Sequence, residues 1–136
     1  MSRIALLLAI VTVAACGPPV EQRSKSDDRT IVWHRIGSWS GKGNQQTESF
    51  ASNSGVLRVR WEASDSESRS SSRRVPAFRL TARSAISGRL LQQVVDHTGS
   101  GNGVSYVQQD PHTFYMIIES SEVNWMITIE DAIAYR

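Results

Sequence analysis

The stretch from residue 123 to 132, VNWMITIEDA, decides the fold class of this chain. Trp125, Ile127 and Ile129 stand at every second position, so in an extended chain they share one face and the residues between them share the other. This period of two indicates a β-strand with one buried face. The preceding residues 113–120, TFYMIIES, are rich in β-branched and aromatic side chains and predict a second strand.

The same pattern continues toward the N-terminus. In residues 55–62, GVLRVRWE, the apolar Leu57, Val59 and Trp61 alternate with charged side chains. No stripe with a helical period is sustained after residue 29, although residues 87–95 leave a helix open as an alternative to a strand. The further predicted strands are 30–36, 47–51, 77–83, 90–97 and 104–108.

These strands predict an all-β fold. Short strands separated by frequent turn signals are typical of an antiparallel two-sheet sandwich or jelly roll, here of about seven or eight short strands. A small barrel is the alternative.

Three segments predict connections between the strands. Residues 98–103, TGSGNG, supply the glycines and the asparagine that a hairpin connection needs. Residues 120–122 are short enough to join two antiparallel neighbours. Residues 63–74, ASDSESRSSSRR, interrupt two strands with serines and charges and predict a mobile surface loop.

The N-terminus has the organisation of an export signal. Arg3 precedes an apolar run over residues 4–15, which at about 12 residues is too short to cross a bilayer but fits the apolar region of a secretory signal. Residues 17–29 are polar and cannot bury enough apolar surface to offset their ordering entropy. The predicted segments are a signal helix over 1–15, a flexible tether over 16–29 and a β-sandwich domain over 30–136.

The end of this signal resembles the lipobox of bacterial lipoproteins. Val13, Ala14 and Ala15 supply the aliphatic and the two small residues of that motif, and Cys16, the single cysteine of the chain, follows them. The resemblance implies that Cys16 receives a diacylglyceryl group, that the signal is removed before it, and that the new amine is acylated, for example by palmitate. Two or more acyl chains hold a protein stably on a membrane.

The lipobox therefore implies a lipid-anchored protein of the cell envelope. In enterobacterial members of that family, aspartate after the cysteine favours the inner membrane. Gly17 stands at that position, which favours the outer membrane if the host is Gram-negative.

The mature domain resembles small bacterial β-sandwich domains of CUB-like type. The resemblance is one of pattern and implies a sandwich fold, without disulfides or calcium ligands that could be carried over to this chain. It rests on Gly37, Gly41, Gly43, Thr47, Phe50, the LRVRW strand at 57–61 and the W-x-I-x-I strand at 125–129.

Composition excludes several classes of partner and site. The 15 lysines and arginines stand against 13 aspartates and glutamates, and they form no basic stripe, so we expect no nucleic-acid partner. A single cysteine excludes an internal disulfide and a cysteine-based zinc cluster.

Catalytic motifs are missing from the sequence. There is no nucleophile elbow, P-loop, H-E-x-x-H or G-x-G-x-x-G motif, and His34, His97 and His112 lie at no spacing that suggests a shared metal. Asp96 and Asp110 lie near two of the histidines, which leaves open an acid–base pair assembled by folding. We expect no enzyme, no metal and no cofactor other than the covalent lipid.

Four carboxylates lie near the C-terminal strands, at Glu119, Glu122, Glu130 and Asp131. Two facing carboxylates at the right separation could hydrolyse a glycosidic bond. We expect these four to be solvated strand ends.

The tryptophans divide into two kinds. Trp33, Trp61 and Trp125 stand among aliphatic neighbours and are expected in the core. Trp39 lies among glycines and serines, and it joins Tyr106 as a candidate ligand contact, because aromatic side chains often anchor protein interfaces or stack on sugars.

The serine-rich loop supplies a second candidate contact. Arg69, Arg73 and Arg74 would give its tip a positive charge suited to anions. Together these features predict a membrane-anchored envelope lipoprotein whose domain is a non-catalytic protein-interaction or structural module. The alternative is a carbohydrate-binding module for cell-wall or surface glycan.

Overall fold

The computed structural model describes residues 29–66 and 74–135, so Cys16, Arg69, Arg73 and the predicted signal lie outside the described residues. The described chain forms nine β-strands, and no helix in it is long and apolar enough to cross a membrane. The strands are β1 (Thr30–Lys42), β2 (Gln45–Gln46), β3 (Phe50–Ser52), β4 (Val56–Asp65), β5 (Ala77–Ser84), β6 (Leu90–Thr98), β7 (Gly101–Gln108), β8 (His112–Ser121) and β9 (Val123–Tyr135).

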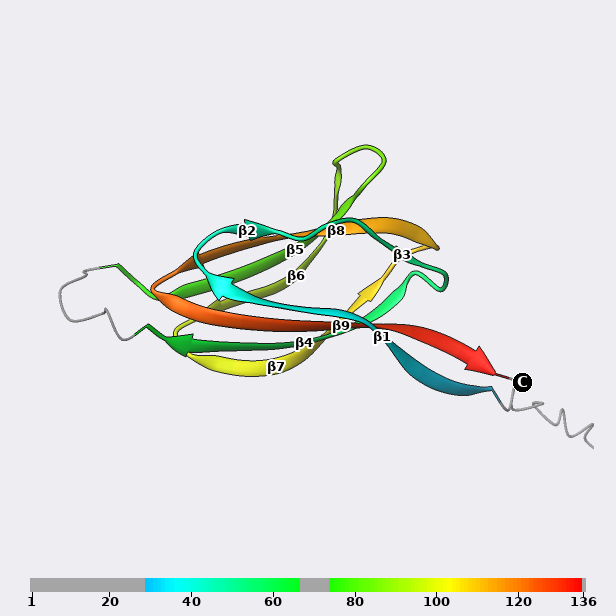
Figure 1. Ribbon diagram of the computed structural model, residues 1–136, viewed down its shortest axis with the longest axis horizontal. Helices are drawn as coiled ribbons and strands as arrows, with labels where there is room; N and C mark the ends of the chain where they lie inside the picture. The colour runs from blue at the N-terminus through cyan, green and yellow to red at the C-terminus, as the bar shows by residue number, and fades with distance from the viewer. Residues whose placement is uncertain (1–28, 67–73, 136) are drawn as a thin grey trace, which may run out of the picture.

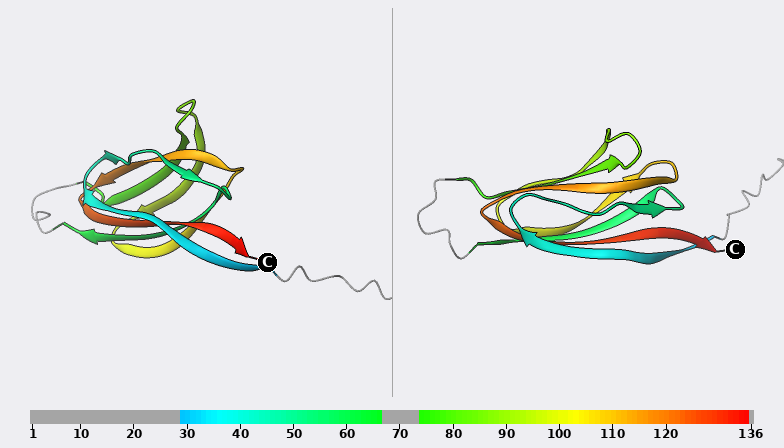
Figure 2. Two further views of the ribbon diagram at one scale, coloured as in Figure 1. Left: turned by 45° about the vertical axis from the view of Figure 1, so that its right-hand side comes forward. Right: turned by 45° about the horizontal axis from the view of Figure 1, so that its top comes forward.

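The strands form two antiparallel sheets that pack face to face (Figures 1 and 2). Sheet A has the order β1-β9-β4-β7, and sheet B has the order β2-β8-β5-β6. The short β2 and β3 both pair with β8 and together act as one interrupted strand. Eight strand positions in this order make a jelly roll. The predicted all-β two-sheet fold is therefore confirmed, and of the alternatives the chain forms the jelly roll.

Two of the predicted connections join different partners than expected. Residues 98–103 are not a hairpin, because β6 belongs to sheet B and β7 to sheet A. The turn before β9 likewise leads from β8 in sheet B to sheet A, with Glu122 at φ 57°. Turn residues mark where the chain reverses, but burial decides which sheet it enters. Between consecutive strands, only β2–β3 and β5–β6 stay within one sheet.

A bulge divides β1 into two halves with opposite facing. The pairing with β9 shifts between Arg35 and Gly37, so Ile36 is an extra residue. Odd-numbered residues before the bulge therefore point to one side of sheet A, and odd-numbered residues after it point to the other side. Trp33 faces outward opposite Ala132, whereas Trp39 faces inward opposite Ile127. The prediction that Trp33 packs in the core is wrong for this reason.

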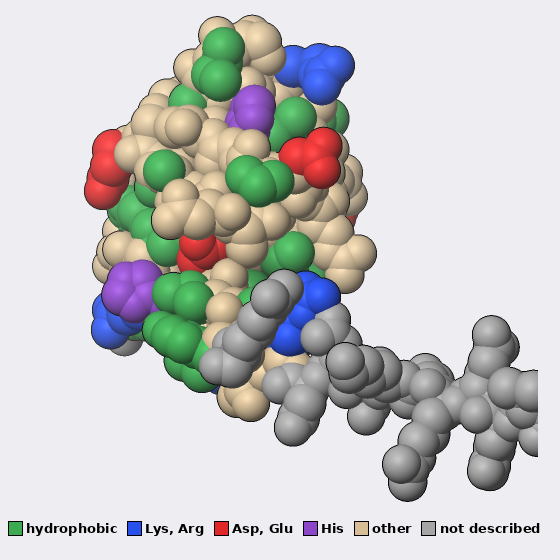
Figure 3. Space-filling model, turned by 90° about the vertical axis from the view of Figure 1, so that its right-hand side faces the viewer, with side chains coloured by type: hydrophobic (Ala, Val, Ile, Leu, Met, Phe, Trp, Pro, Cys, Tyr) green, Lys and Arg blue, Asp and Glu red, His purple; other side chains and the backbone are tan. Residues whose placement is uncertain are grey.

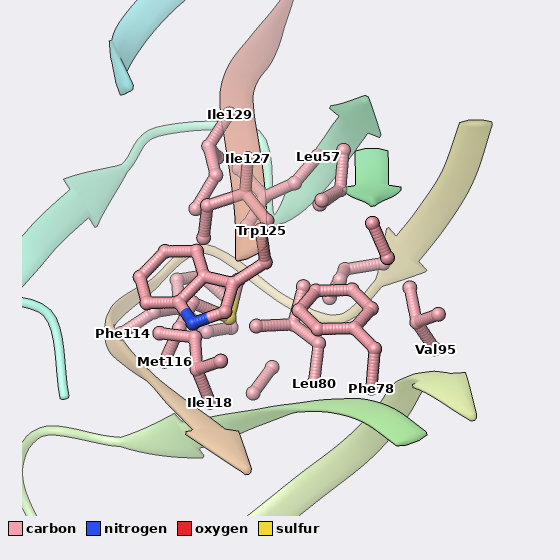
Figure 4. Close-up of a cluster of buried hydrophobic side chains, with 14 of the residues drawn as sticks. Leu57, Phe78, Leu80, Val95, Phe114, Met116, Ile118, Trp125, Ile127 and Ile129 are labelled. Atoms are coloured by element: carbon pink, nitrogen blue, oxygen red, sulfur yellow. The ribbon is translucent and has the colours of Figure 1, made fainter. Parts of the chain in front are cut away.

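The core lies between the sheets (Figure 4). Trp125 is buried as predicted, and Trp61 is partly buried on Phe78 and His97. Gly41 and Gly103 stand inside strands against these rings, since a Cβ there would lie 3.0 Å from Trp125 and 2.9 Å from Trp61. The largest fully buried side chains are Phe78, Phe114, Leu57, Leu80, Met116, Ile118, Ile127, Ile129, Val59, Val107 and Val123.

The alternative of a helix over 87–95 is not realised, because β6 begins at Leu90. Its apolar residues come in pairs because the pairing of β5 with β6 shifts twice and leaves Leu91 and Val94 as extra residues. Both extra side chains pack against the core. A bulged strand can thus bury neighbouring residues that a regular strand would place on opposite faces.

Candidate functional site

Of the predicted contact residues, Trp39, Tyr106 and Arg74 are described, and they come from different parts of the fold. Trp39 is partly buried, packs on Phe50 with ring centroids 6.0 Å apart, and donates its indole N–H to Glu48 at 3.1 Å. The pKa of the Glu48 carboxyl is lowered by a hydrogen bond from the backbone of Glu48 and by the hydrogen bond from Trp39. Trp39 thus closes the edge of the sandwich, and its part in ligand binding stays a prediction. Arg74 is exposed at the start of the second described range.

Tyr106 lies on the outer face of sheet A, and the structure places an unexpected neighbour beside it. Its ring contacts that of Trp33, with centroids 5.9 Å apart and planes inclined by 49°. The two residues come from β7 and β1, the opposite edges of the sheet. Their side chains therefore lean toward each other across the sheet, where the small Ala132 stands opposite Trp33.

Arg58 fills the space under these rings. Its guanidinium lies 4.6 Å from the Trp33 ring centroid, within cation–π range. Its Nε donates to Glu130 at 2.5 Å, and Arg60 donates to the same carboxylate oxygen at 3.3 Å. The hydrogen bond from Arg58 lowers the pKa of Glu130, partial burial opposes this, and the bond from Arg60 adds to the lowering. The bond to Glu130 in turn raises the pKa of Arg58.

Apolar side chains continue this surface. Val104, Tyr106 and Met126 are each about half exposed (48–52%) and lie on three successive outward-facing rungs of sheet A. We call the group the sheet A patch. It consists of Trp33, Arg58, Arg60, Val104, Tyr106, Met126 and Glu130.

A shallow hollow of about 460 Å³ adjoins the patch at Met126. Its lining combines polar side chains with Trp125 and Met126 and comes from β1, β4 and β9, three neighbouring strands of sheet A. The lining residues are Ser40, Gly41, Lys42, Glu62, Ser64, Asn124, Trp125 and Met126. The combination of hydroxyl, amide and charged groups suits a small polar ligand or the polar rim of a larger contact.

Among the described residues, neither His97 nor His112 is hydrogen-bonded to the aspartate near it in sequence. His112 instead lies 2.7 Å from the hydroxyl of the buried Ser84. That hydroxyl also accepts the backbone N–H groups of Ile86 and Ser87, so it holds the turn between β5 and β6. A buried hydroxyl that is fully engaged in this way is a structural element of the turn rather than an accessible nucleophile. No group of three or more potential metal ligands occurs among the described residues.

The C-terminal carboxylates point to different sides of the sandwich. Glu119 is exposed on sheet B and pairs with Arg79, whereas Glu130 is shielded on sheet A. Asp131 is buried, which contradicts its expected solvation. It accepts hydrogen bonds from Ser52 (2.6 Å), Ser54 (2.5 Å) and the backbone of Asn53 (3.1 Å), and so fixes the turn between β3 and β4.

The sequence predicts Tyr106 as a contact but does not indicate its neighbours in the sheet A patch, and the role of Tyr106 in binding stays a prediction. Arg58 was visible as the outward residue of the LRVRW strand, but its alternation with apolar residues indicates only an exposed position. Trp33 was hidden by the bulge at Ile36, which no local signal announces. Comparison of the sequence with protein-family models gives no match, and comparison with curated proteins gives none.

Proposed function

We propose that this protein is a lipid-anchored, non-catalytic protein-binding module of the cell envelope. The observation that carries the proposal is the sheet A patch, in which half-exposed Val104, Tyr106 and Met126 lie beside ordered arginines. Tryptophan, tyrosine, methionine and arginine are the residues enriched in protein interfaces, and tryptophan, tyrosine and arginine dominate their energetics.

The order of the patch adds to this argument. Arg58 is held between Glu130 and Trp33, so it would lose little conformational entropy when a partner binds. A preorganised arginine that keeps donors beyond those used by Glu130 can meet carboxylates or carbonyl groups of a partner. The membrane anchor rests separately on the lipobox resemblance at Cys16.

The proposal is tested by capture from solubilised envelope. The full chain, purified in detergent from its native host, is immobilised, and retained proteins are identified by mass spectrometry. The patch variant Val104→Thr/Tyr106→Thr/Met126→Thr keeps side chains that favour strands, and Arg79→Ala/Glu119→Ala on sheet B is the matched control. We expect a partner retained by the wild type and the control but not by the patch variant.

Retention of the same proteins by the patch variant contradicts the proposed interface. Intact mass spectrometry of the same preparation tests the anchor, since an unmodified full-length mass contradicts lipidation of Cys16. The two results are independent of each other.

The hollow beside the patch supports glycan binding as a second candidate. Ser40, Glu62 and Asn124 offer hydroxyl, carboxylate and amide groups that can bind sugar hydroxyls. The Trp33 and Tyr106 rings, inclined at 49° and packed together, do not form a flat platform for a sugar. Binding of cell-wall polysaccharide that is lost in Asn124→Ala and kept in Val104→Thr/Tyr106→Thr, which leaves the hollow unchanged, would favour this candidate.

A further inference from the structure

The start of β1 and the end of β9 form a two-stranded ribbon beyond the rest of the sandwich. The pairing of β9 with β4 begins at Asp131, whereas its pairing with β1 continues to Tyr135. Figures 1 and 2 show these two strands running past the other strands of both sheets. We call residues 30–32 and 133–135 the ribbon tip.

Apolar side chains are exposed on both sides of the ribbon tip. Ile31 and Val32 are neighbours in a strand and so point to opposite faces, and together with Tyr135 they are 46–59% exposed. Figure 3 looks onto this end of the molecule, where hydrophobic side chains are exposed among polar ones. A ribbon that is apolar on both faces is unlike a sheet that turns one polar face to water.

The position of the ribbon tip along the chain indicates what it meets. Thr30 begins the tip, and 13 residues separate it from Cys16. Whatever their conformation, these residues can span no more than about 50 Å. The tip is therefore the first part of the described domain beyond the proposed lipid anchor.

The two stretches that form the tip carry no acidic side chain that would repel an anionic surface. Residues 29–34, RTIVWH, and 132–135, AIAY, contain one arginine and no carboxylate side chain. Tyrosine is among the residues that favour the boundary between acyl chains and headgroups.

We propose that the ribbon tip inserts its apolar side chains into the lipid interface next to the anchor and holds the sandwich end-on to the membrane. This inference rests on the proposed lipid anchor and deepens it. In this orientation sheet A stands upright on the membrane. Its outer face, with the sheet A patch, then points away from the molecule along the membrane surface and stays open to a partner.

Site-specific quenching by lipid tests the proposal. Ala134→Cys places an environment-sensitive fluorophore at the tip without removing Ile31, Val32 or Tyr135, and Ser64→Cys places it at the opposite end of sheet A. Lipidated full chain is reconstituted into vesicles of phosphatidylethanolamine and phosphatidylglycerol whose acyl chains carry bromine near the headgroup. We expect quenching and a blue shift of emission at position 134, and neither at position 64.

A second pair of variants separates apolar contact from mere closeness to the anchor. Ile31→Thr/Val32→Thr/Tyr135→Thr in the Ala134→Cys chain should lose the quenching. Val104→Thr/Met126→Thr, which changes exposed apolar residues on the side of sheet A, should keep it. Quenching that persists in the tip variant overturns the proposal, because the tether alone then brings position 134 near the lipid.

The remaining outcomes distinguish the tip from the anchor. If the chain floats with the vesicles but position 134 is not quenched, or both positions are quenched alike, the tip proposal is overturned and the anchor stands. If the chain does not float with the vesicles, the anchor fails and the tip proposal fails with it. Concentration-dependent dimers that the tip substitutions abolish, with position 134 unquenched, would assign the tip to a second copy instead.

Discussion

The two outer faces of the sandwich carry ion pairs of the same chemistry in different surroundings. On sheet A, Arg58 and Glu130 lie 2.5 Å apart with side chains only 19% and 14% exposed. On sheet B, Arg79 lies 3.6 Å from Asp96 and 3.8 Å from Glu119, and all three side chains are 51–55% exposed. The aromatic side chain of Trp33 above Arg58 is what sheet B lacks in these contacts. Shielding, rather than the presence of charges, distinguishes an ordered surface from a solvated one.

The largest expected difference between the faces concerns their glutamates. Glu130→Ala leaves two arginines without their shared acceptor, and it should lower the free energy of unfolding by about 2 kcal/mol. Glu119→Ala should change it by less than about 0.5 kcal/mol. Urea unfolding of both variants measures the difference. Equal effects would mean that the shielding on sheet A has no energetic consequence.

Removing the Trp33 ring should make the ion pair of sheet A contribute as little to stability as the ion pairs of sheet B. Trp33→Ala loses the contact with Tyr106 and the cation–π contact with Arg58, which together stabilise by about 1.5 kcal/mol. In the Trp33→Ala background, the loss of unfolding free energy caused by Glu130→Ala should fall toward the loss caused by Glu119→Ala. A double-mutant cycle measures the coupling, and strict additivity would contradict the role given to the ring.

A smaller effect follows from acidification. Because the pKa of Glu130 lies below its ordinary value of 4.5 in the folded protein, its ionised form stabilises the fold fully above that value. This contribution is lost as the pH falls through the lowered folded-state pKa. The stability difference between the wild type and Glu130→Gln should therefore narrow when denaturation is repeated below pH 4.5. A gap that stays constant would show that the charge of Glu130 is not what stabilises the pair.

The smallest expected effect is the response of sheet B to salt. Arg79→Ala should cost at most about 0.5 kcal/mol at low ionic strength. The cost should vanish in 1 M salt, where the screening length is about 3 Å. Thermal melts at both salt concentrations test this, and the cost of Glu130→Ala, measured in parallel, should be much less sensitive to salt.

The sequence was a good guide to the strands, because burial on one face imposes a period of two wherever the strand is regular. The stretch around Trp125 and Ile127 follows this rule and was predicted correctly. Irregular strands break the rule. Ile36 in β1 and Leu91 and Val94 in β6 are extra residues, and each reverses which residues face the core.

The glycines of residues 98–103 led to a wrong prediction for a different reason. The sequence pattern predicts a turn at Gly101 and Gly103, but both belong to β7. Position 103 requires glycine because the Trp61 ring occupies the space where a Cβ would lie. A glycine needed for room looks the same in a sequence as one needed for backbone freedom, and only the neighbour across the sheet distinguishes them.

The candidate site was predictable only in part for a related reason. Tyr106 has the alternation of an exposed strand residue, and the sequence predicts it as a contact. Its neighbours Trp33, Arg58 and Glu130 come from three other strands that are brought together by the order of sheet A. That order depends on which sheet each turn enters, and no local pattern contains this information.

The pairing of β1 with β9 also decides when the protein can fold. Thr30 pairs with Tyr135, so sheet A joins the first and last described strands, and β9 lies between β1 and β4. A nascent chain that ends before residue 123 therefore lacks the central strand of this sheet, and only the β5–β6 hairpin can pair locally. Contacts this distant in sequence form slowly. Folding is thus delayed until nearly all of the described strands have been synthesised, which fits the export that we propose for this chain.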